Sequence, residues 1–318
     1  MNWKLSIVVP CYNEEKRIRP LLESLKAQTV KPEVLFVDGG STDGTTKLIE
    51  ELIKTNRNIR LLRETEHRSP ANARNIGIKA ATGNLLRIMN ADAVFEKDYT
   101  KKVIEAFRQN PDADDIDFKH EPLISKTTNA FQKALFLKDE VYGYALNGQL
   151  HSITKTELQR KIGYYDPKLG FGEDRCVERH GFQKHKFKRV VAKEKIGMSQ
   201  LSYTTFYAFF VRCLWYGRTI PIYLKKERTD WPILLYYLIS VLTIPLIFLF
   251  LVHPIFSVTL TLILAAVFSY GLWRVLKIVC IGYCCKELVM IPFLEVAELI
   301  GIGLGFFQYI LGNRTVGR

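Results

Sequence analysis

The chain has 318 residues, a net charge of +13 at pH 7 and a hydrophobic fraction of 48%. This length is enough for one large domain with an appended segment, and the apolar fraction is ordinary for a globular protein. The charges are unevenly placed, because residues 231–273 contain no Asp, Glu, Lys or Arg. These numbers exclude an even distribution of charge and divide the sequence into a charged part and an apolar part.

The charged part, residues 1–230, carries a net charge of +11 (40 Lys and Arg minus 29 Asp and Glu). Such a surplus fits an anionic partner, which charge alone leaves open between a phosphate-bearing ligand, nucleic acid and an acidic lipid surface. The N-terminal stretch MNWKLSIVVP has an apolar run too short for a secretory signal, so the charged part is expected in the cytosol. The six cysteines show no metal-ligand spacing with histidines and are expected to be free thiols in a reducing compartment.

Short β-branched runs alternate with helical periodicity in the first 90 residues, which predicts βα units around a largely parallel sheet. A nucleotide or cofactor then belongs at the carboxyl ends of the strands. The expected strands are 5–9, 34–37, 59–62 and 85–89, and the expected helices are 14–28, 42–54 and 69–81.

Two of these strands end in polar clusters, VVPCYNEE (8–15) and FVDGGSTDGT (36–45). Asp38 follows an apolar strand, so its carboxylate can accept a hydrogen bond from a base, and the glycines after it let a ligand approach the backbone. The alternative is structural: residues 41–43 are ordinary helix-capping residues and the two glycines an ordinary turn. The clusters alone leave both readings open.

The segment TTFYAFFVRCLWYGRTIPIYLKKER (204–228) mixes aromatic residues with Arg212, Arg218 and a lysine pair. This mixture is favoured at the headgroup boundary of a membrane, and we expect an interfacial helix here. A core helix rich in Phe is the alternative.

The apolar part contains an uncharged stretch, 232–252, that is long enough to span a bilayer, and a second stretch, 255–273, that can return. A large buried hairpin is the alternative. A third stretch, 288–311, contains Glu295 and Glu298 on one helical face, so it either spans or lies against the others in the interface. Basic residues between the second and third stretches favour a cytosolic position there, and a spanning third stretch would put the C-terminus outside. We therefore expect three parts, residues 1–200, 201–230 and 231–318.

Five ordered motifs resemble those of family-2 inverting glycosyltransferases of the GT-A fold. They are VVPCYNEE, VDGGSTDGT, ANARNIGIKAATG (71–83), MNADAVF (89–95) and GFGED (170–174), and the resemblance covers about residues 4–220. It implies an α/β class: a Rossmann-like, mostly parallel cytosolic GT-A domain followed by an α-helical transmembrane region. It also implies a nucleotide-diphosphate sugar as donor, linked to UDP or GDP, without specifying the sugar.

The resemblance also implies roles for individual residues. Asp92 and Asn90 match the metal motif, Asp174 matches the catalytic base, and Glu173 stands beside it. A guanidinium fork suits phosphate oxygens, so Arg74 is expected near the diphosphate. The residues implied to bind the nucleotide sugar are Pro10, Tyr12, Asn13, Glu14, Asp38, Gly40, Arg74, Asn75, Asn90 and Ala91.

A divalent metal, Mg²⁺ or Mn²⁺, is expected because the diphosphate leaving group needs its charge neutralised. Here the sequence departs from the family pattern: the first acid of the metal motif is Asn90, an amide that supplies an oxygen but no charge. Alternation in an extended segment would place Asn90 and Asp92 on the same side. The alternative is a loop that caps a helix starting near Lys97.

Asp174 is the expected general base, because a sugar hydroxyl that attacks an anomeric carbon must lose its proton. The alternative is that Glu173 and Asp174 only stabilise a helix start. A complete Gly-Glu-Asp motif favours a hydroxyl acceptor on a lipid-linked saccharide, although transferases acting on polyprenyl phosphate share the fold. No Gln-x-x-Arg-Trp motif occurs, so one sugar per encounter is expected.

These features predict a membrane-anchored, metal-dependent, inverting and non-processive glycosyltransferase in the plasma membrane, with its catalytic domain in the cytosol. Arg212 and Arg218 are expected to hold a diphosphate or to anchor at headgroups. The basic stretch KHKFKR (184–189) lacks a recognition-helix pattern, so no nucleic-acid partner is expected. The alternatives are a non-catalytic module that binds nucleotide sugar and, more weakly, a nucleotidyltransferase. The oligomeric state stays open.

Overall fold

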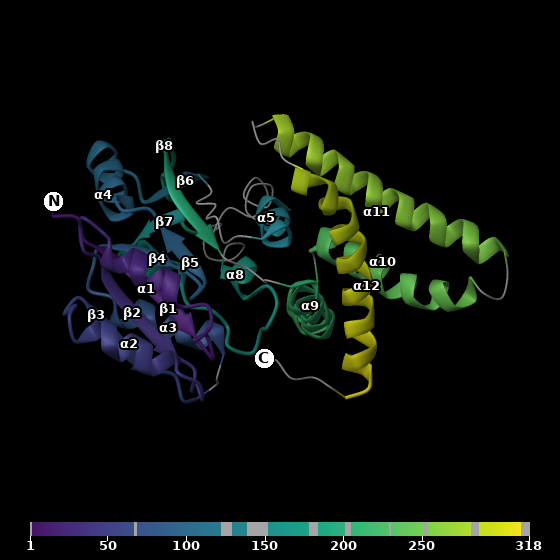
Figure 1. The fold of residues 1–318 in the computed structure, drawn as a ribbon, viewed down its shortest axis with the longest axis horizontal. Helices are drawn as coiled ribbons and strands as arrows, with labels where there is room; N and C mark the ends of the chain where they lie inside the picture. The colour runs from purple at the N-terminus through teal and green to yellow at the C-terminus, as the bar shows by residue number, and fades with distance from the viewer. Residues whose placement is uncertain are drawn as a thin grey trace. The chain divides into compact units, whose positions relative to one another are not determined.

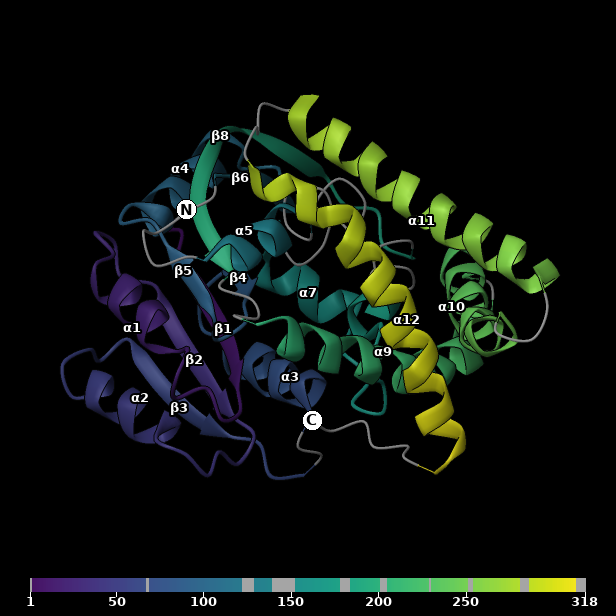
Figure 2. The same cartoon turned by 45° about the vertical axis from the view of Figure 1, so that its right-hand side comes forward.

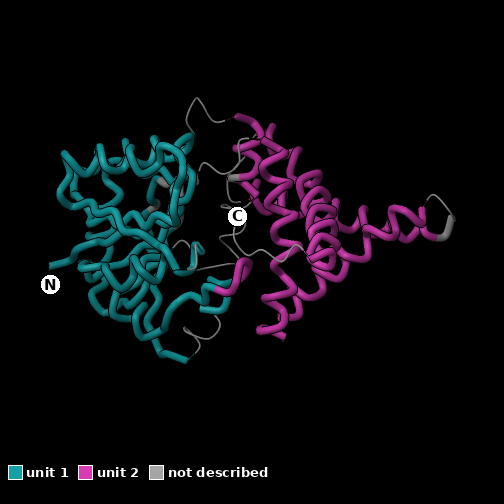
Figure 3. The backbone as a smooth tube through the Cα atoms, turned by 90° about the horizontal axis from the view of Figure 1, so that it is seen from below, with its two compact units in different colours: residues 1–126, 147–167, 173–201 teal, residues 127–146, 168–172, 202–318 magenta. Residues whose placement is uncertain are grey.

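The computed structural model describes residues 2–66, 69–121, 129–138, 152–177, 184–200, 205–228, 230–250, 254–280 and 286–312. The chain forms two compact units that are not contiguous in sequence (Figure 3). Unit 1 comprises residues 1–126, 147–167 and 173–201, and unit 2 comprises residues 127–146, 168–172 and 202–318. Cys284 and Cys285, two of the six expected free thiols, lie outside the described residues.

Unit 1 contains the predicted βα units (Figure 1). The helix predicted at residues 14–28 begins only at Arg19, where Pro20 suits the first turn of a helix because it has no N–H to leave unsatisfied. The elements in chain order are β1 (Leu5–Cys11), α1 (Arg19–Lys26), β2 (Glu33–Asp38), α2 (Thr45–Ile53), β3 (Ile59–Arg63), α3 (Pro70–Ala80), β4 (Leu85–Ile88), β5 (Ala93–Phe95), α4 (Tyr99–Gln109), β6 (Asp115–Glu121), β7 (Ser152–Lys155), α7 (Thr156–Ile162), α8 (Glu173–Cys176) and β8 (Arg189–Gln200).

The sheet has the strand order β3-β2-β1-β4-β7-β6-β8-β5, and its first four strands are parallel. Successive residues of a strand point to opposite faces, so β1 sends Ile7 and Val9 to one hydrophobic cluster and Val8 to the other. The first cluster includes residues of α1, α2 and α4, and the second includes residues of α3. The predicted GT-A type of fold, with a mostly parallel sheet between helices, is confirmed for this unit.

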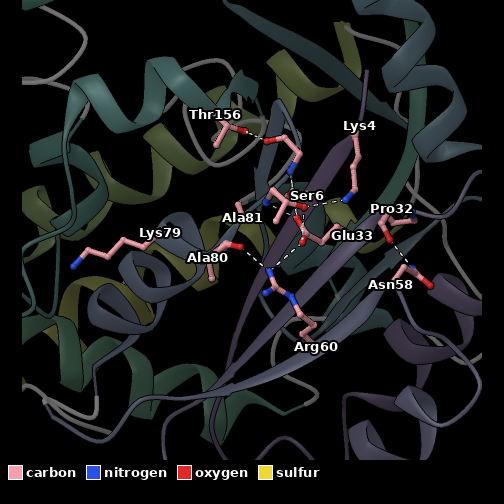
Figure 4. Close-up of polar contacts among 12 residues, drawn as sticks. Lys4, Ser6, Pro32, Glu33, Asn58, Arg60, Lys79, Ala80, Ala81 and Thr156 are labelled. Atoms are coloured by element: carbon pink, nitrogen blue, oxygen red, sulfur yellow. Dashed lines mark hydrogen bonds and ion pairs between the residues drawn. The ribbon is translucent and has the colours of Figure 1, made fainter. Parts of the chain in front are cut away.

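The amino-terminal edge of the parallel strands is closed by a polar cluster around the buried Glu33 (Figure 4). Its carboxylate accepts hydrogen bonds from Ser6 Oγ (2.5 Å), from the backbone N–H of Thr82 (2.8 Å) and from the guanidinium of Arg60 (3.0 Å). Because these donors come from β1, β3 and the turn before β4, Glu33 ties together the starts of the parallel strands.

The described residues of unit 2 are mainly helical, and three of the helices among them are long and apolar enough to cross a membrane. The helix that corresponds to the third predicted stretch differs from the other two, because 56% of its apolar window is buried inside the protein, against 22% and 11%. It therefore packs mainly against protein. The described helices of the unit are α5 (Ala130–Phe136), α9 (Phe206–Lys226), α10 (Trp231–Leu249), α11 (Pro254–Cys280), the 3₁₀ helix η3 (Lys286–Met290) and α12 (Ile291–Ile310).

The two carboxylates of α12 have basic partners within unit 2. Glu295 pairs with Arg274 of α11, and Glu298 pairs with Lys138, which follows α5, at 2.5 Å. The Arg274 guanidinium also donates to the backbone carbonyl of Lys138. Carboxylates in an apolar helix are costly unless they face partners, and these contacts supply such partners.

Helix α12 lies beside α9 (Figures 1 and 2), and their shared core includes Phe209, Cys213 and Ile302. Residues 168–172, which contain the Gly-Phe-Gly part of the GFGED motif, also pack on α9. The Phe171 ring lies 5.3 Å from the ring of Tyr216. Gly172 has φ +76°, and a Cβ there would lie 2.4 Å from the Tyr223 ring, so only glycine fits this contact.

Candidate functional site

The predicted ligand edge of the sheet is present in unit 1. The strand register pairs Cys11 of β1 with Asp38 of β2, and Asp38 with Arg63 of β3. On the other side of β1, the backbone N–H of Met89 donates to the carbonyl of Val8 (2.9 Å). The three predicted polar stretches, 12–14, 38–40 and 90–92, therefore follow neighbouring strands at the same edge.

Asp38 is fully buried and organises the turn that follows it. Its carboxylate accepts hydrogen bonds from the backbone N–H groups of Gly40 (3.1 Å) and Ser41 (3.2 Å), and from Arg63 Nη1 (3.2 Å). These donors hold the turn with its glycines in one conformation. The predicted contact between Asp38 and the base stays a prediction.

The loops after β1 and β2 are bonded to each other. Asn13, whose φ is +53°, donates its backbone N–H to Ser41 Oγ (2.9 Å), and its side-chain oxygen accepts from the N–H of Thr42 (2.8 Å). Asp43 accepts from the backbone N–H of Thr45, the first residue of α2, at 3.0 Å. The N-cap of α2 is Gly44, which has no side-chain cap hydrogen bond, so the capping alternative is wrong for these residues. Asp43 binds the first helical N–H from the position before the cap, and Ser41 and Thr42 bond Asn13.

The other residues of these loops that are predicted to bind the nucleotide sugar differ in solvent exposure. Tyr12 is 43% exposed at the end of β1, and Pro10 is half-buried within that strand. Glu14 forms an ion pair with Arg17 at 2.8 Å. The exposed Tyr12 ring is accessible to a planar ligand, whereas the Glu14 carboxylate is already paired with Arg17 within the loop.

The metal motif has a different backbone from the one expected. Residues 91 and 92 form a turn, in which the N–H of Ala93 donates to the carbonyl of Asn90 (3.3 Å). The expected extended alternation is therefore wrong, because the chain turns between β4 and β5. The helix-cap alternative for Asp92 is also wrong, since α4 begins at Tyr99 and Asp98 precedes it.

The residues of this turn fit a divalent cation that is shared with a phosphate ligand. Asn90 is exposed, Asp92 is half-buried and Ala91 between them is buried. In the part of the chain that the structure describes, no three His, Cys, Asp or Glu side chains form a metal-binding group. One carboxylate and one amide oxygen suit Mg²⁺ or Mn²⁺ when substrate phosphates and water supply the other ligands.

The acid pair of the GFGED motif begins the short helix α8, and it has partners from α3. Arg74 forms an ion pair with Glu173, and its guanidinium lies 5.4 Å from the ring centre of Tyr165. The Asn75 side chain donates to the carbonyl of Tyr165 (2.7 Å) and accepts from its N–H (2.8 Å). Residues 71–75, the ANARN motif at the start of ANARNIGIKAATG, therefore contact the loop that carries the two acids, residues 164–174, which we call the acid loop.

The two acids have different environments. Burial raises the pKa of the Glu173 carboxyl, against the opposing effect of the Arg74 guanidinium. Asp174 is half-buried, and its Oδ1 accepts from the backbone N–H of Arg175 (2.8 Å). Glu173 is thus engaged by Arg74, which sequence reasoning placed at the diphosphate. The diphosphate contact of Arg74 stays a prediction.

Arg212 and Arg218 lie on α9 in unit 2. The Arg212 guanidinium lies 5.6 Å from the ring centre of Phe209 and 5.5 Å from that of Tyr216. This stacking accounts for the interleaving of aromatic and basic residues in the sequence. The predicted binding of Arg212 and Arg218 to a diphosphate or a lipid headgroup stays a prediction.

Sequence reasoning missed two residues at the carboxyl end of β3, Arg63 within the strand and Glu64 after it. Arg63 binds Asp38, and the buried Glu64 accepts hydrogen bonds from Asn72 of α3 (2.9 Å) and from the N–H of Glu66 (3.0 Å). The sequence does contain a signal for them, because charged residues that follow a predicted parallel strand, here 59–62, lie at the ligand edge of the sheet.

Residues 6–148 match the family model "Glycosyl transferase family 2". Poly-beta-1,6-N-acetyl-D-glucosamine synthase of Staphylococcus epidermidis is 32% identical over 108 residues, 34% of this chain and 26% of the synthase. Glycosyltransferase AglE of Haloferax volcanii is 35% identical over 91 residues, 28% of this chain and 30% of AglE. The matches thus span less than a third of either relative.

Two solved structures share the fold. The mannosyltransferase PcManGT from Pyrobaculum calidifontis, in complex with GDP-Man and Mn²⁺, has a TM-score of 0.57 at 18% identity over 96% of this chain and 88% of its own. S. aureus TarS, residues 1–349, has a TM-score of 0.52 at 18% identity over 98% and 92%. By its sequence match over residues 6–148 and by its fold, the chain carries a glycosyl transferase family 2 domain of the GT-A type.

Proposed function

We propose that the protein is an inverting glycosyltransferase that moves a sugar from a UDP- or GDP-linked donor to a membrane-associated acceptor. The observation that carries this proposal is the family 2 domain in which Asp38, at the end of β2, and the Asn90–Asp92 turn, after β4, lie on either side of β1 at one edge of the sheet. The mannosyltransferase with the same fold was solved with GDP-Man and Mn²⁺, which supports a nucleotide sugar and a divalent metal.

The donor would bind across the loops after β1 and β2. The exposed ring of Tyr12 is placed for stacking on the base, and Gly40, at φ +88°, leaves the backbone open to a ligand. Asp38 and Asn13 hold these loops in position. Pro10 and Glu14 would complete the base and ribose side.

Asp92 and Asn90 would hold a magnesium or manganese ion together with the donor's diphosphate. When bound, such an ion would supply the positive charge that offsets the charge developing on the leaving nucleoside diphosphate. Asn90 contributes no charge, so the metal is expected to bind weakly until the donor is present.

Asp174 would serve as the general base. The acceptor oxygen forms a bond to the anomeric carbon on the face opposite the leaving group, and the bond from that carbon to the phosphate oxygen breaks. The electron pair of the broken bond leaves with the nucleoside diphosphate, and the hydroxyl proton passes to the Asp174 carboxylate. Inversion at the anomeric carbon follows from this single displacement, whereas transfer of one sugar per encounter is proposed because the sequence has no Gln-x-x-Arg-Trp motif.

The acceptor would be a hydroxyl of a lipid-linked saccharide. Helices α10 and α11 are apolar and largely unburied, which supports a membrane anchor. The plasma membrane as its location and the cytosolic side for unit 1 are part of this proposal. The interfacial position of residues 201–230 belongs to this proposal. Transfer to a polyprenyl phosphate is the alternative, and a phosphate acceptor would need no base.

The test uses the full-length protein in nanodiscs with UDP- and GDP-linked sugars and MnCl₂, and it measures release of nucleoside diphosphate. Asp174→Asn should retain donor binding and lose at least about a hundredfold in transfer rate. Glu157→Gln, which alters an exposed carboxylate on α7, is the matched control and should leave the rate unchanged. Full activity of Asp174→Asn would contradict the role of Asp174 as general base. If the wild-type protein binds the donor but releases no nucleoside diphosphate, the result would favour the non-catalytic module.

A further inference from the structure

We propose that helix α3 is a positioning element for the acid loop, in which Arg74 and Asn75 act through Glu173 and Tyr165 to place Asp174. This inference rests on the proposed function and changes the role assigned to the ANARN motif. It takes Arg74 and Asn75 away from the donor and makes them supports of the catalytic base.

The contacts of Asn75 define the loop's backbone. Its amide makes two reciprocal hydrogen bonds to one residue, Tyr165, at 2.7 and 2.8 Å. Asn75 and Tyr165 are both 7% exposed, so water competes little for these groups. A side-chain amide that satisfies both backbone groups of one residue fixes that residue in place, as a neighbouring strand would.

The contacts of Arg74 define the end of the loop. Arg74 is 7% exposed, its guanidinium pairs with Glu173, and the same group covers the Tyr165 ring. Two points of the loop, one at each end, are thus held by consecutive residues of one helix. Asp174 directly follows Glu173, so any shift of that ion pair moves its backbone.

Helix α3 is itself fixed to the sheet. Gly77 lies so close to β1 that a Cβ there would stand 2.2 Å from Val8 Cγ1. The helix begins at a capped residue, since Ser69 Oγ accepts from the N–H of Asn72 (3.1 Å), and Asn72 in turn bonds Glu64. The support for the acid loop is therefore rigid, as precise placement of a base requires.

Pairing with Arg74 also gives the two acids different surroundings. Burial raises the pKa of the Glu173 carboxyl even though it pairs with the Arg74 guanidinium. Glu173 is therefore tied to Arg74 and connects α3 to the base.

The experiment compares Arg74→Gln, Arg74→Lys, Glu173→Gln and Asn75→Ala in full-length protein in nanodiscs. Donor affinity is measured with UDP-GlcNAc and GDP-mannose in MnCl₂, and turnover by release of nucleoside diphosphate. Each variant should lower kcat by about tenfold to a hundredfold, the cost of a slightly misplaced group, with donor Kd changed less than about twofold. Arg74→Lys should recover part of the loss of Arg74→Gln.

A double-mutant comparison separates positioning from donor binding. Arg74→Gln combined with Glu173→Gln should be no slower than the slower single variant, because both remove the same contact. In the Asp174→Asn background, Arg74→Gln should have no further effect on turnover. A tenfold rise of donor Kd in that background would overturn the proposal and return Arg74 to the diphosphate.

A measurement without turnover keeps this proposal separate from the proposed function. Amide hydrogen exchange in residues 164–176 should increase in Arg74→Gln and Asn75→Ala, and stay unchanged in Tyr12→Ala, which alters the donor side only. Unchanged protection in the α3 variants would refute the positioning role even if the wild type released no nucleoside diphosphate. Increased exchange with an inactive wild type would refute only the proposed function.

Discussion

Strand β2 carries a buried carboxylate at each end, Glu33 and Asp38, and the two ends of the sheet use them differently. Glu33 accepts hydrogen bonds from segments far along the chain, including Ser6, Arg60 and Thr82. Asp38 accepts two of its hydrogen bonds from the turn that directly follows it. The amino-terminal edge therefore uses its carboxylate to join strands, and the carboxyl edge uses its carboxylate to shape a loop.

The difference follows from where parallel strands begin and end. At the amino-terminal edge the side chains of several strands converge and satisfy one another, so little is left for a ligand. At the carboxyl edge the polar groups stand on loops, and loops can present an exposed ring, as at Tyr12, or a carboxylate in a turn, as at Asp92. Substitutions at the two edges should separate stability from activity.

The largest effect is expected for Asp92→Ala at the carboxyl edge. Loss of the only carboxylate of the Asn90–Asp92 turn should lower transfer by about a hundredfold to a thousandfold, as when an electrostatic stabiliser of the transition state is removed. EDTA should reduce wild-type transfer to a similar extent, with recovery on adding MnCl₂. Turnover is measured alongside the melting temperature, which should stay unchanged; a fully active Asp92→Ala variant would contradict the metal role.

The next effect is expected for Glu33→Gln at the opposite edge. The variant keeps the side-chain shape but weakens charge-assisted hydrogen bonds in a buried cluster, so the free energy of unfolding should fall by about 2–3 kcal/mol. Denaturant unfolding of the purified protein measures this change. Donor Kd of the folded variant should equal that of the wild type, and a selective loss of donor binding would show that the two edges are not independent.

A smaller effect is expected for Gly77→Ala, which tests the seat of α3 on β1. The added methyl group would contact Val8, and overpacking of this kind costs about 1–3 kcal/mol of unfolding free energy. Because α3 supports the acid loop, kcat should fall as well. Val8→Ala makes room for the methyl group, and the double variant should regain turnover if the contact is the cause.

The smallest effect is a pH dependence of the Glu33 contribution. Burial acts to raise the pKa of Glu33, but the hydrogen bonds from Ser6 and Thr82 outweigh it, and the pKa lies below its ordinary value of 4.5. A lowered folded pKa means that the stabilisation is fully present above the unfolded pKa and is lost as pH falls through the folded pKa. The difference in stability between wild type and Glu33→Gln should thus be constant near pH 7 and shrink below about pH 4.5. If the stability difference between wild type and Glu33→Gln grew on acidification, the pKa of Glu33 would have to be raised on folding and not lowered.

Much of unit 1 could be predicted because its signals are local. Apolar runs bounded by turn residues specify β1, β2 and β3, and the polar residues after them mark the ligand edge without further information. Asn90 and Asp92 were expected together for the same reason, but their backbone was not: the turn closed by Ala93 depends on how β5 leaves the sheet.

The sequence by itself determined the βα order, the charge-free stretch and the motifs that identify the family, because each depends on residues near one another in the chain. Only the tertiary structure decided the partners of the buried charges: Arg74 with Glu173, Glu33 with Arg60, and Glu295 with Arg274. A buried charge is stable only beside an opposite charge or hydrogen-bond donors, yet many residues of a chain could provide them. Folding selects the pair, and here that selection gives the ANARN motif a role at the acid loop.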